Sequence, residues 1–454
     1  GLTVITAVLF ITGEMTGSGV LALPKAVKDA GWVGLFLIFM CAGISSFTGT
    51  VLGRCWTLLR DNKPELKGHC SDPYPTIGYN TFGRPGKIIV NISVYFTLYG
   101  VCVVLLLIAS GNIQSLLAQI EFHTYLMFAK GIPVNADISL FLAPFCWLKS
   151  PKDFWPIALG ATVTTAIACV LIFIQAIMDI KVAHNRTVEY RETHPDGFES
   201  FFLAFGMILF CFGGMAAFPT IQADMREPER FPKAVIVAMG SILCMYIPVG
   251  AIGFSVYGDL VADNIFDSLS QGPMKTIATI LITMHLVFAY VIIQNPLSQV
   301  FEMPLNLPDE FGWKRVLVRT SITLVVIFTA ESCPRFGHIL ALVGGSAVTL
   351  NTFVFPSIFF WRLTRLHGKE WDNALKFFST QSTNTAGSTP QPTPNRRYMP
   401  KRVIPFHVTI ITIGVIGGIS ATYSAIRGIT DPAAFVPPCY VNITAASYMG
   451  VRSG

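Results

Sequence analysis

The sequence has 454 residues and a mass of 49.6 kDa, with 52% hydrophobic and 13% charged residues and a mean hydropathy of +0.57. Roughly a quarter of the residues in soluble proteins are charged, so this chain cannot cover a soluble surface, and it is too apolar to be disordered. The net charge is +6, but no basic stripe with interleaved aromatic residues is present, so the pattern predicts a membrane protein without a nucleic acid partner.

Eleven segments are apolar and long enough to cross a bilayer, which takes roughly 20 mostly apolar residues. We therefore expect an all-α polytopic membrane protein with about eleven transmembrane helices. The fourth segment is the shortest and weakest of the eleven. In chain order they are residues 2–24, 31–58, 86–118, 133–149, 154–178, 198–221, 233–257, 273–301, 314–330, 335–362 and 403–427.

The distribution of basic residues predicts a cytosolic N-terminus. In that orientation the cytosolic loops hold 22 of the 32 Lys and Arg residues, the excess expected on that side. Two glycosylation sequons, at Asn185 and Asn442, then fall outside, where acceptors must lie. Cys333 and Cys439 fall on the same side, so an exterior disulfide is an option that depends on their Cα separation. The chain opens on Gly1 without a visible cleavable signal, and we expect that a cytosolic leader has been removed.

Two glycine-rich interruptions break the first and sixth segments. GEMTGSGVLALP (13–24) and FCFGGMAAFP (210–219) each carry a glycine pair followed five to seven residues later by proline. Five segments separate the two breaks, and because five is odd, a second five-helix repeat would be inverted relative to the first. Inverted repeats with discontinuous helices are a sequence pointer to a transporter's binding site.

The same pattern divides the chain. We expect a first repeat over 1–178, a second over 198–362, a cytosolic linker over 363–402, an eleventh helix over 403–427 and an exterior tail over 428–454. Within the linker, residues 379–400 are rich in Ser, Thr and Pro and are expected to be disordered.

An unwound helix suggests what the breaks bind. Unpaired backbone N–H and C=O groups cost several kcal/mol in lipid, so they persist only where they line a cavity. N–H groups at a half-helix N-terminus suit a carboxylate and freed carbonyls suit an ammonium, which are the two ends of an amino acid. Glycine also serves close helix packing and proline kinks are routine, but two breaks at matched positions favour a binding site.

The residues around both breaks resemble one family. GSGVLALPKAVKDAGWVG (17–34) resembles the first-helix signature of the amino acid/auxin permease family. FPTIQADMREPERFPKAV (218–235) is similar to the segment after that family's sixth helix. The resemblance implies a leucine-transporter-type 5+5 inverted repeat and amino acids carried with protons or sodium. It includes both vesicular inhibitory amino acid transporters and proton-coupled plasma-membrane or lysosomal carriers.

The resemblance assigns candidate substrate residues. The first break would bind the substrate carboxylate and the second would offer carbonyls to its ammonium; these residues are Thr16, Gly17, Ser18 and Gly19, and Phe212, Gly213 and Gly214. Tyr95 and Tyr99 are four apart and share one helix face, so one of them is a further candidate, with plain packing as the alternative.

Candidates for ion coupling lie in the first and eighth segments. Glu14 is the only acid deep in the first segment, and intramembrane carboxylates are usually functional, so it is our first choice for proton coupling; a structural partner is the alternative. His285 is a second candidate as a relay, against an ordinary inter-helix hydrogen bond. Ser298 would serve a sodium site, which is disfavoured because the first segment offers no obvious sodium-ligating Asn.

Charged residues near the inner ends of the sixth and eighth segments suggest a gate. Asp224, Arg226 and Glu302 would form a cytosolic ion-pair cluster, although a solvated loop explains them equally well.

These observations predict a proton-coupled secondary active transporter of small neutral amino acids that works by alternating access. A sodium-coupled transporter and an amino-acid sensor on the same fold remain alternatives. We expect no enzyme, no metal and no cofactor beyond H+ or Na+, because no ATP-binding motif, HExxH, paired catalytic aspartates or His/Cys cluster is present. The expected partners are the amino acid and the bilayer of a plasma, lysosomal or vesicular membrane, with the chain as a monomer.

Overall fold

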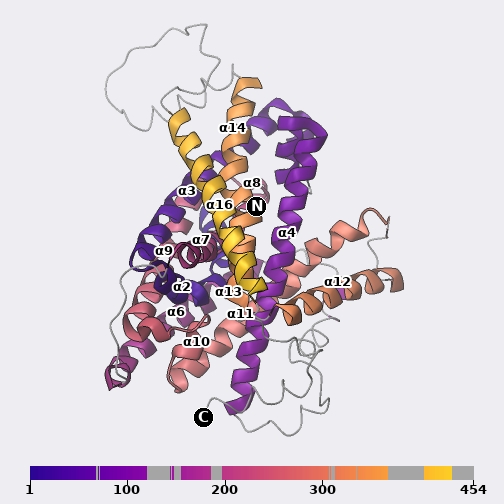
Figure 1. The fold of residues 1–454 in the computed structure, drawn as a ribbon. Helices are drawn as coiled ribbons and strands as arrows, with labels where there is room; N and C mark the ends of the chain where they lie inside the picture. The colour runs from indigo at the N-terminus through magenta and orange to yellow at the C-terminus, as the bar shows by residue number, and fades with distance from the viewer. Residues whose placement is uncertain are drawn as a thin grey trace.

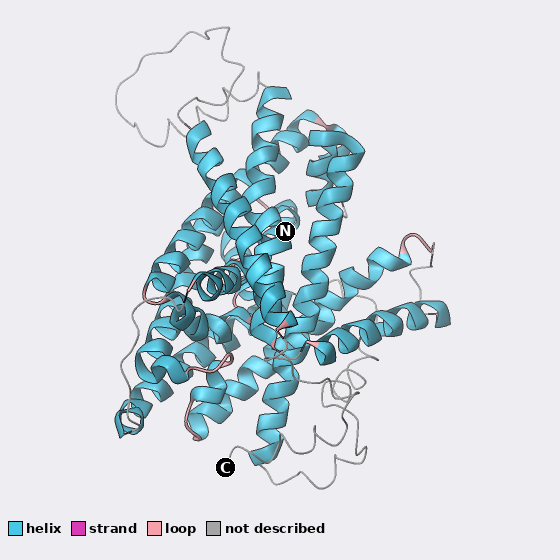
Figure 2. Cartoon of the chain, in the orientation of Figure 1, coloured by secondary structure: helices cyan, strands magenta, loops and turns pink. Residues whose placement is uncertain are grey.

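The computed structural model describes residues 1–67, 70, 72–119, 144, 146–147, 155–185, 197–305, 307, 312–333, 335–366 and 403–431. Within these ranges all regular structure is helical apart from one isolated β-bridge between Leu2 and Met225 (Figure 2). The predicted all-α class is confirmed.

Figure 1 labels most of the longer helices. Their bounds are α1 Val4–Met15, α2 Gly19–Ala30, α3 Val33–Asn62, η1 Pro64–Lys67, α4 Pro73–Gln119, α6 Trp155–Asn185, α7 Phe198–Cys211, η3 Gly214–Ala217, α8 Phe218–Asp224, η4 Pro228–Arg230, α9 Phe231–Tyr257, η5 Gly258–Leu260, α10 Ile265–Ser268, α11 Pro273–Glu302, α12 Trp313–Ser332, α13 Phe336–Val343, η6 Gly344–Val348, η7 Leu350–Val354, α14 Phe355–Leu366 and α16 Ile404–Thr430.

Nine of the eleven predicted spans correspond to candidate membrane spans in the described part of the chain. Eight helices are long and apolar enough to cross a membrane, and α1 with α2 forms a ninth that is bent by 59° at its break. The predicted span 314–330 forms the 20-residue helix α12, which lacks this apolar character because it carries several basic residues. The predicted span 133–149 lies almost wholly outside the described residues, as do most of the linker and the tail.

Small residues bring the central helices together. Helix α2 packs against α7 and α9, α1 packs against α6 and α9, and α7 packs against α13, η6 and α16. At Gly344 an added Cβ would lie 2.0 Å from the carbonyl oxygen of Gly206, so only glycine allows α7 and η6 to approach this closely. Close approach through small residues is the usual means of helix association in membranes.

The tenth predicted span contains two π-helical segments, η6 and η7, which the sequence pattern does not predict. The wider π turn lets the Thr349 hydroxyl donate to the Gly344 carbonyl five residues earlier, at 2.7 Å. In η7 the Asn351 carbonyl accepts from the Tyr74 hydroxyl at 2.5 Å, and the Asn351 amide donates to the Thr97 hydroxyl at 3.2 Å. These bonds tie the span to α4, and π segments in helices often lie at functional sites.

Candidate functional site

Both predicted helix breaks are present. Helix α1 ends at Met15 and α2 begins at Gly19, while α7 ends at Cys211 and the chain resumes as η3 and α8. The interruptions therefore fall on the glycine-rich sequences that predicted them, and the expectation of broken first and sixth spans is confirmed.

The two breaks lie against each other. A Cβ added at Gly19 would lie 2.7 Å from the Cys211 sulfur, and one at Gly214 would lie 2.7 Å from the Met15 side chain. Both distances are shorter than real Cβ contacts, so the glycines are required by close approach of one broken helix to the other. The structure thus brings the two predicted sets of substrate residues together.

A tyrosine that the sequence analysis did not single out joins the breaks. The Tyr246 hydroxyl of α9 lies 2.6 Å from the Met15 carbonyl and 3.1 Å from the Cys211 carbonyl. These are the last residues of α1 and α7, where helix carbonyls lack intrahelical partners. The side chain is fully buried, and its ring meets Phe212 edge to face at 5.7 Å. A tyrosine within an apolar helix carries no sequence signal for such a role.

The amide groups at the start of α2 are suited to an anion. Ser18 is the N-cap residue but its side chain makes no capping hydrogen bond, and the first N–H groups of a helix have no intrahelical acceptor. The Thr16 hydroxyl donates instead to the Thr12 carbonyl at 2.7 Å, so its proton is not available to a ligand. Backbone donors around Gly17 and Gly19, with the Ser18 hydroxyl, remain the candidates from this break.

His285 of α11 reaches the first break. Its Nδ1 lies 3.1 Å from the Ala161 carbonyl and 3.0 Å from the Thr165 hydroxyl, both on α6. A carbonyl only accepts, so this bond assigns the proton to Nδ1 and leaves Nε2 of the neutral ring as an acceptor. A Cβ at Gly17 would lie 2.9 Å from that Nε2. The predicted inter-helix hydrogen bond is therefore present, and the second nitrogen faces the break; the relay role stays a prediction.

Glu14 lies beside the second break. Its side chain is exposed, although Gly13 and Met15 on either side are buried. Its Cγ lies 3.4 Å from the position of a Cβ at Gly214. The carboxylate is therefore accessible beside the second break, and its role in proton coupling stays a prediction.

The other candidates in α4 and α11 make contacts away from the breaks. The Tyr99 hydroxyl bonds to the Thr329 hydroxyl and lies 3.3 Å from the Val325 carbonyl, so it holds α4 to α12. Tyr95 is half-buried on the same helix. Ser298 is fully buried and donates to the Gln294 carbonyl of its own helix at 2.8 Å.

The predicted gate residues separate into two groups. Glu302 accepts from Arg319 of α12, with Nε–Oε1 at 2.6 Å and a second bond at 3.2 Å, and Arg315 approaches it at 3.3 Å. Arg319 is fully buried and also donates to the Cys146 carbonyl at 2.7 Å. This network joins α11 to α12.

Asp224 and Arg226 hold the start of the chain instead. The Leu2 amide donates to the Asp224 carbonyl at 2.7 Å, and the Arg226 amide donates to the Leu2 carbonyl at 2.9 Å. The Arg226 side chain adds a bond to the Gly1 carbonyl at 2.8 Å. The bridge links the entry of α1 to the segment after α8, and a gating role for either group stays a prediction.

Three further predictions rest on the chain ends and loops. Asn185 is the last residue of α6, while Asn442 and Cys439 lie outside the described residues. Cys333 directly follows α12 and is partly buried. In the part of the chain that the structure describes, no group of three or more His, Cys, Asp or Glu side chains could hold a metal ion.

Comparisons with known structures report the fold. The chain is similar to MhsT in complex with L-phenylalanine, with a TM-score of 0.56 and 14% identity over 93% of this chain and 98% of that one. It is also similar to a variant of the Eremococcus coleocola manganese transporter, with a TM-score of 0.55 and 11% identity over 98% of this chain and 90% of that one. These neighbours have the leucine-transporter-type fold, which the chain shares.

Comparisons of sequence report the family. Amino acid transporter AVT1C of Arabidopsis thaliana is 25% identical over 79% of this chain, which spans 63% of the relative's length. Amino acid transporter AVT1H of the same plant is 27% identical over 82% of this chain and 83% of its own. The model of the transmembrane amino acid transporter proteins matches residues 1–383. The chain therefore belongs to the transmembrane amino acid transporter family.

Proposed function

We propose that the chain is a proton-coupled secondary active transporter of small neutral amino acids, which binds its substrate between the two helix breaks. The observation that carries the proposal is the direct contact between the breaks at Gly19 and Cys211 and at Gly214 and Met15. Contact between the two interrupted helices brings the start of α2 next to the end of α7, and helix-terminal N–H and carbonyl groups suit the carboxylate and the ammonium of one ligand. The family and its named relatives support amino acids as the substrate class.

The groups around the breaks also support a small substrate. Phe212 and Tyr246 meet ring to ring, and both are fully buried. The Nε2 of His285 offers an acceptor beside Gly17, where a transferred proton would be held. Two aromatic rings and an imidazole leave little room for a long side chain, which is why we favour small neutral amino acids.

Glu14 is the proposed coupling group. It is the acidic side chain next to the breaks, and in the described part of the chain no cation pairs with it. Protonation would remove the negative charge of Glu14, so the protonated and the deprotonated carboxyl would favour different conformations of the carrier. A proton gradient then biases the direction in which the carrier moves its substrate.

Uptake into proteoliposomes that hold the purified chain tests the proposal. A panel of neutral, cationic and acidic radiolabelled amino acids is supplied at acidic and neutral outer pH, with and without sodium. We expect a pH gradient alone to drive concentrative uptake, and Glu14→Gln to abolish it, whereas Asp259→Asn, a change at an exposed residue of η5, should not. Sodium-dependent uptake would refute proton coupling, and binding without concentrative uptake under any gradient would refute transport and leave a sensor.

A further inference from the structure

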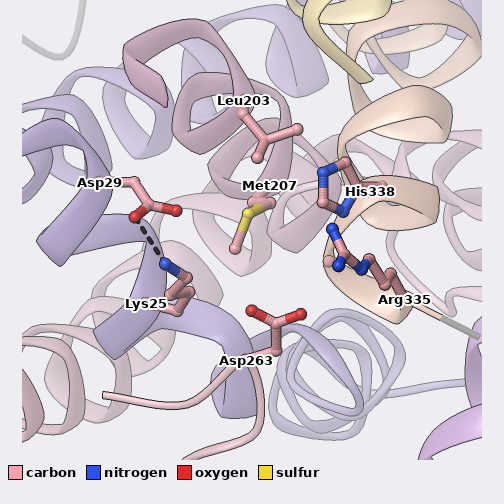
Figure 3. A pocket seen from close by; sticks show the side chains of 8 residues that line it. Lys25, Asp29, Leu203, Met207, Asp263, Arg335 and His338 are labelled. Carbon is pink, nitrogen blue, oxygen red and sulfur yellow. Dashed lines mark hydrogen bonds and ion pairs between the residues drawn. The ribbon is translucent and has the colours of Figure 1, made fainter. Parts of the chain in front are cut away.

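A cavity lies at the end of the bundle where α2 ends, away from the helix breaks (Figure 3). Its volume is about 370 Å³, and it is lined by residues of α2, α7, the loop before α10 and the start of α13. None of the residues at the two breaks lines it. Small-molecule sites measure roughly 300–1,000 Å³, so this cavity has the size of a ligand site.

The walls of this cavity carry charges of both signs. Lys25 lies 2.8 Å from Asp29 one helix turn away, so these two neutralise each other. Asp263 and Arg335 point into the same space from opposite segments (Figure 3), and within the described residues neither forms an ion pair or a side-chain hydrogen bond. The Nδ1 atom of His338 is also buried without a hydrogen-bond partner in that part of the chain.

Asp263 and Arg335 are both partly exposed, so water can solvate them, and a ligand that displaces this water must offer a partner of opposite charge to each. A cation alone would satisfy Asp263 and leave Arg335 unpaired, and an anion alone would do the reverse. A molecule with an ammonium and a carboxylate on neighbouring atoms satisfies both. Arginine is well suited to the second group because its planar guanidinium binds a carboxylate through two parallel hydrogen bonds.

We propose that this cavity is a second amino-acid site, in which Asp263 holds the ammonium and Arg335 the carboxylate of a zwitterion. Leu203 and Met207 of α7 form an apolar wall for a small side chain, and Gly337 contributes no side chain to fill the space. A Cβ at Gly337 would meet the Asp263 carboxylate at 3.5 Å, an ordinary contact, so the glycine leaves the cavity open beside the carboxylate. The inference goes beyond the proposed function, because the site holds its ligand whether or not the breaks transport it.

Protection of a cysteine in the cavity wall tests the site directly. Leu203→Cys is introduced together with Cys244→Ser, which removes an exposed native cysteine. The purified full chain in detergent is treated with a charged thiol reagent, and modification of the peptide that carries position 203 is followed by mass spectrometry. We expect L-alanine to slow this reaction, whereas L-alanine amide, which lacks the carboxylate, and N-acetyl-L-alanine, which lacks the ammonium, should not.

Variants separate this cavity from the breaks. Asp263→Asn and Arg335→Gln should each raise the half-protecting alanine concentration about tenfold or more, because each removes a charged hydrogen-bonding partner. Gly17→Val, which crowds His285 at the first break, should leave protection intact. The proposal is overturned if alanine gives no protection, if protection survives both charge variants, or if Gly17→Val abolishes it in a variant that stays monodisperse. Uptake measured separately shows whether the transport proposal fails independently.

Discussion

Removing a single oxygen atom, that of the Tyr246 hydroxyl, tests the geometry of the two helix breaks. It lies within hydrogen-bonding distance of the last carbonyl of α1 and of α7, at 2.6 and 3.1 Å. Tyr246→Phe removes this donor and keeps the ring that packs on Phe212. A hydroxyl has one proton and donates to one carbonyl at a time. The change therefore removes one hydrogen bond and leaves both buried carbonyls without this donor.

A buried acceptor left without its donor costs about 1–3 kcal/mol. If the bond holds the breaks in the binding geometry, most of this cost falls on the substrate-bound state, and about 1.4 kcal/mol there corresponds to a tenfold loss of affinity. We therefore expect Tyr246→Phe to weaken binding of the best-transported amino acid about tenfold or more. The thermal unfolding temperature should fall as well, because the hydroxyl bonds buried carbonyls in the folded protein.

The assay is substrate competition in proteoliposomes, with unfolding of the same preparations followed by fluorescence. Tyr423→Phe is the matched control, because that tyrosine lies on α16 with 54% of its surface exposed. The reasoning is refuted if Tyr246→Phe binds substrate as the unmodified chain does. An equal loss in Tyr423→Phe would also refute it, since the effect would then not arise at the breaks.

Three further changes have defined outcomes. Gly19→Ala should cost about 1–3 kcal/mol of stability through overpacking on Cys211, measured as a lower unfolding temperature, whereas Gly43→Ala, which meets open space in α3, should be neutral or stabilising. Arg319→Ala should cost about 3–5 kcal/mol and sharply reduce the yield of folded protein, because it removes the principal partner of the buried Glu302; a normal yield would contradict this. His285→Phe keeps a ring but no acceptor nitrogen, so amino-acid uptake should fall at unchanged expression; unchanged uptake would remove His285 from the site.

The breaks could be predicted because a pair of glycines followed by proline is a local signal. The glycines of these sequences also lie where the two broken helices approach each other closely and only a small residue fits, as the contacts of Gly19 and Gly214 confirm. The partners of these segments could not be predicted, because they depend on how helices far apart in the chain pack. Tyr246 lies 231 residues from Met15, and nothing in its own helix distinguishes it from a packing tyrosine.

Helix periodicity likewise left the choice of neighbour open. Tyr95 and Tyr99 share a face, but only the packing of α4 on α12 shows that Tyr99 bonds to Thr329. Glu302 was grouped with Asp224 and Arg226 because all three carry charge near predicted inner helix ends. The buried Arg319, seventeen residues further along, binds Glu302 in their place. The sequence shows which of these residues are charged, but it does not show which residues form ion pairs with one another.

The two halves of the first broken helix are held unequally. At its N-terminal end α1 is tied to the segment after α8 by the Leu2 bridge, with backbone bonds of 2.7 and 2.9 Å. At its C-terminal end Met15 shares the Tyr246 hydroxyl with Cys211. Helix α2 meets α7 through the close contact of Gly19 with Cys211, and the 370 Å³ cavity lies beside its far end. Tilting α1 away from the second broken helix would break hydrogen bonds at both of its ends. Moving α2 away from α7 would break a bond at its C-terminal end, where the Ser200 hydroxyl donates to the Asp29 carbonyl at 3.2 Å, so this conformation is secured mainly on the α1 side.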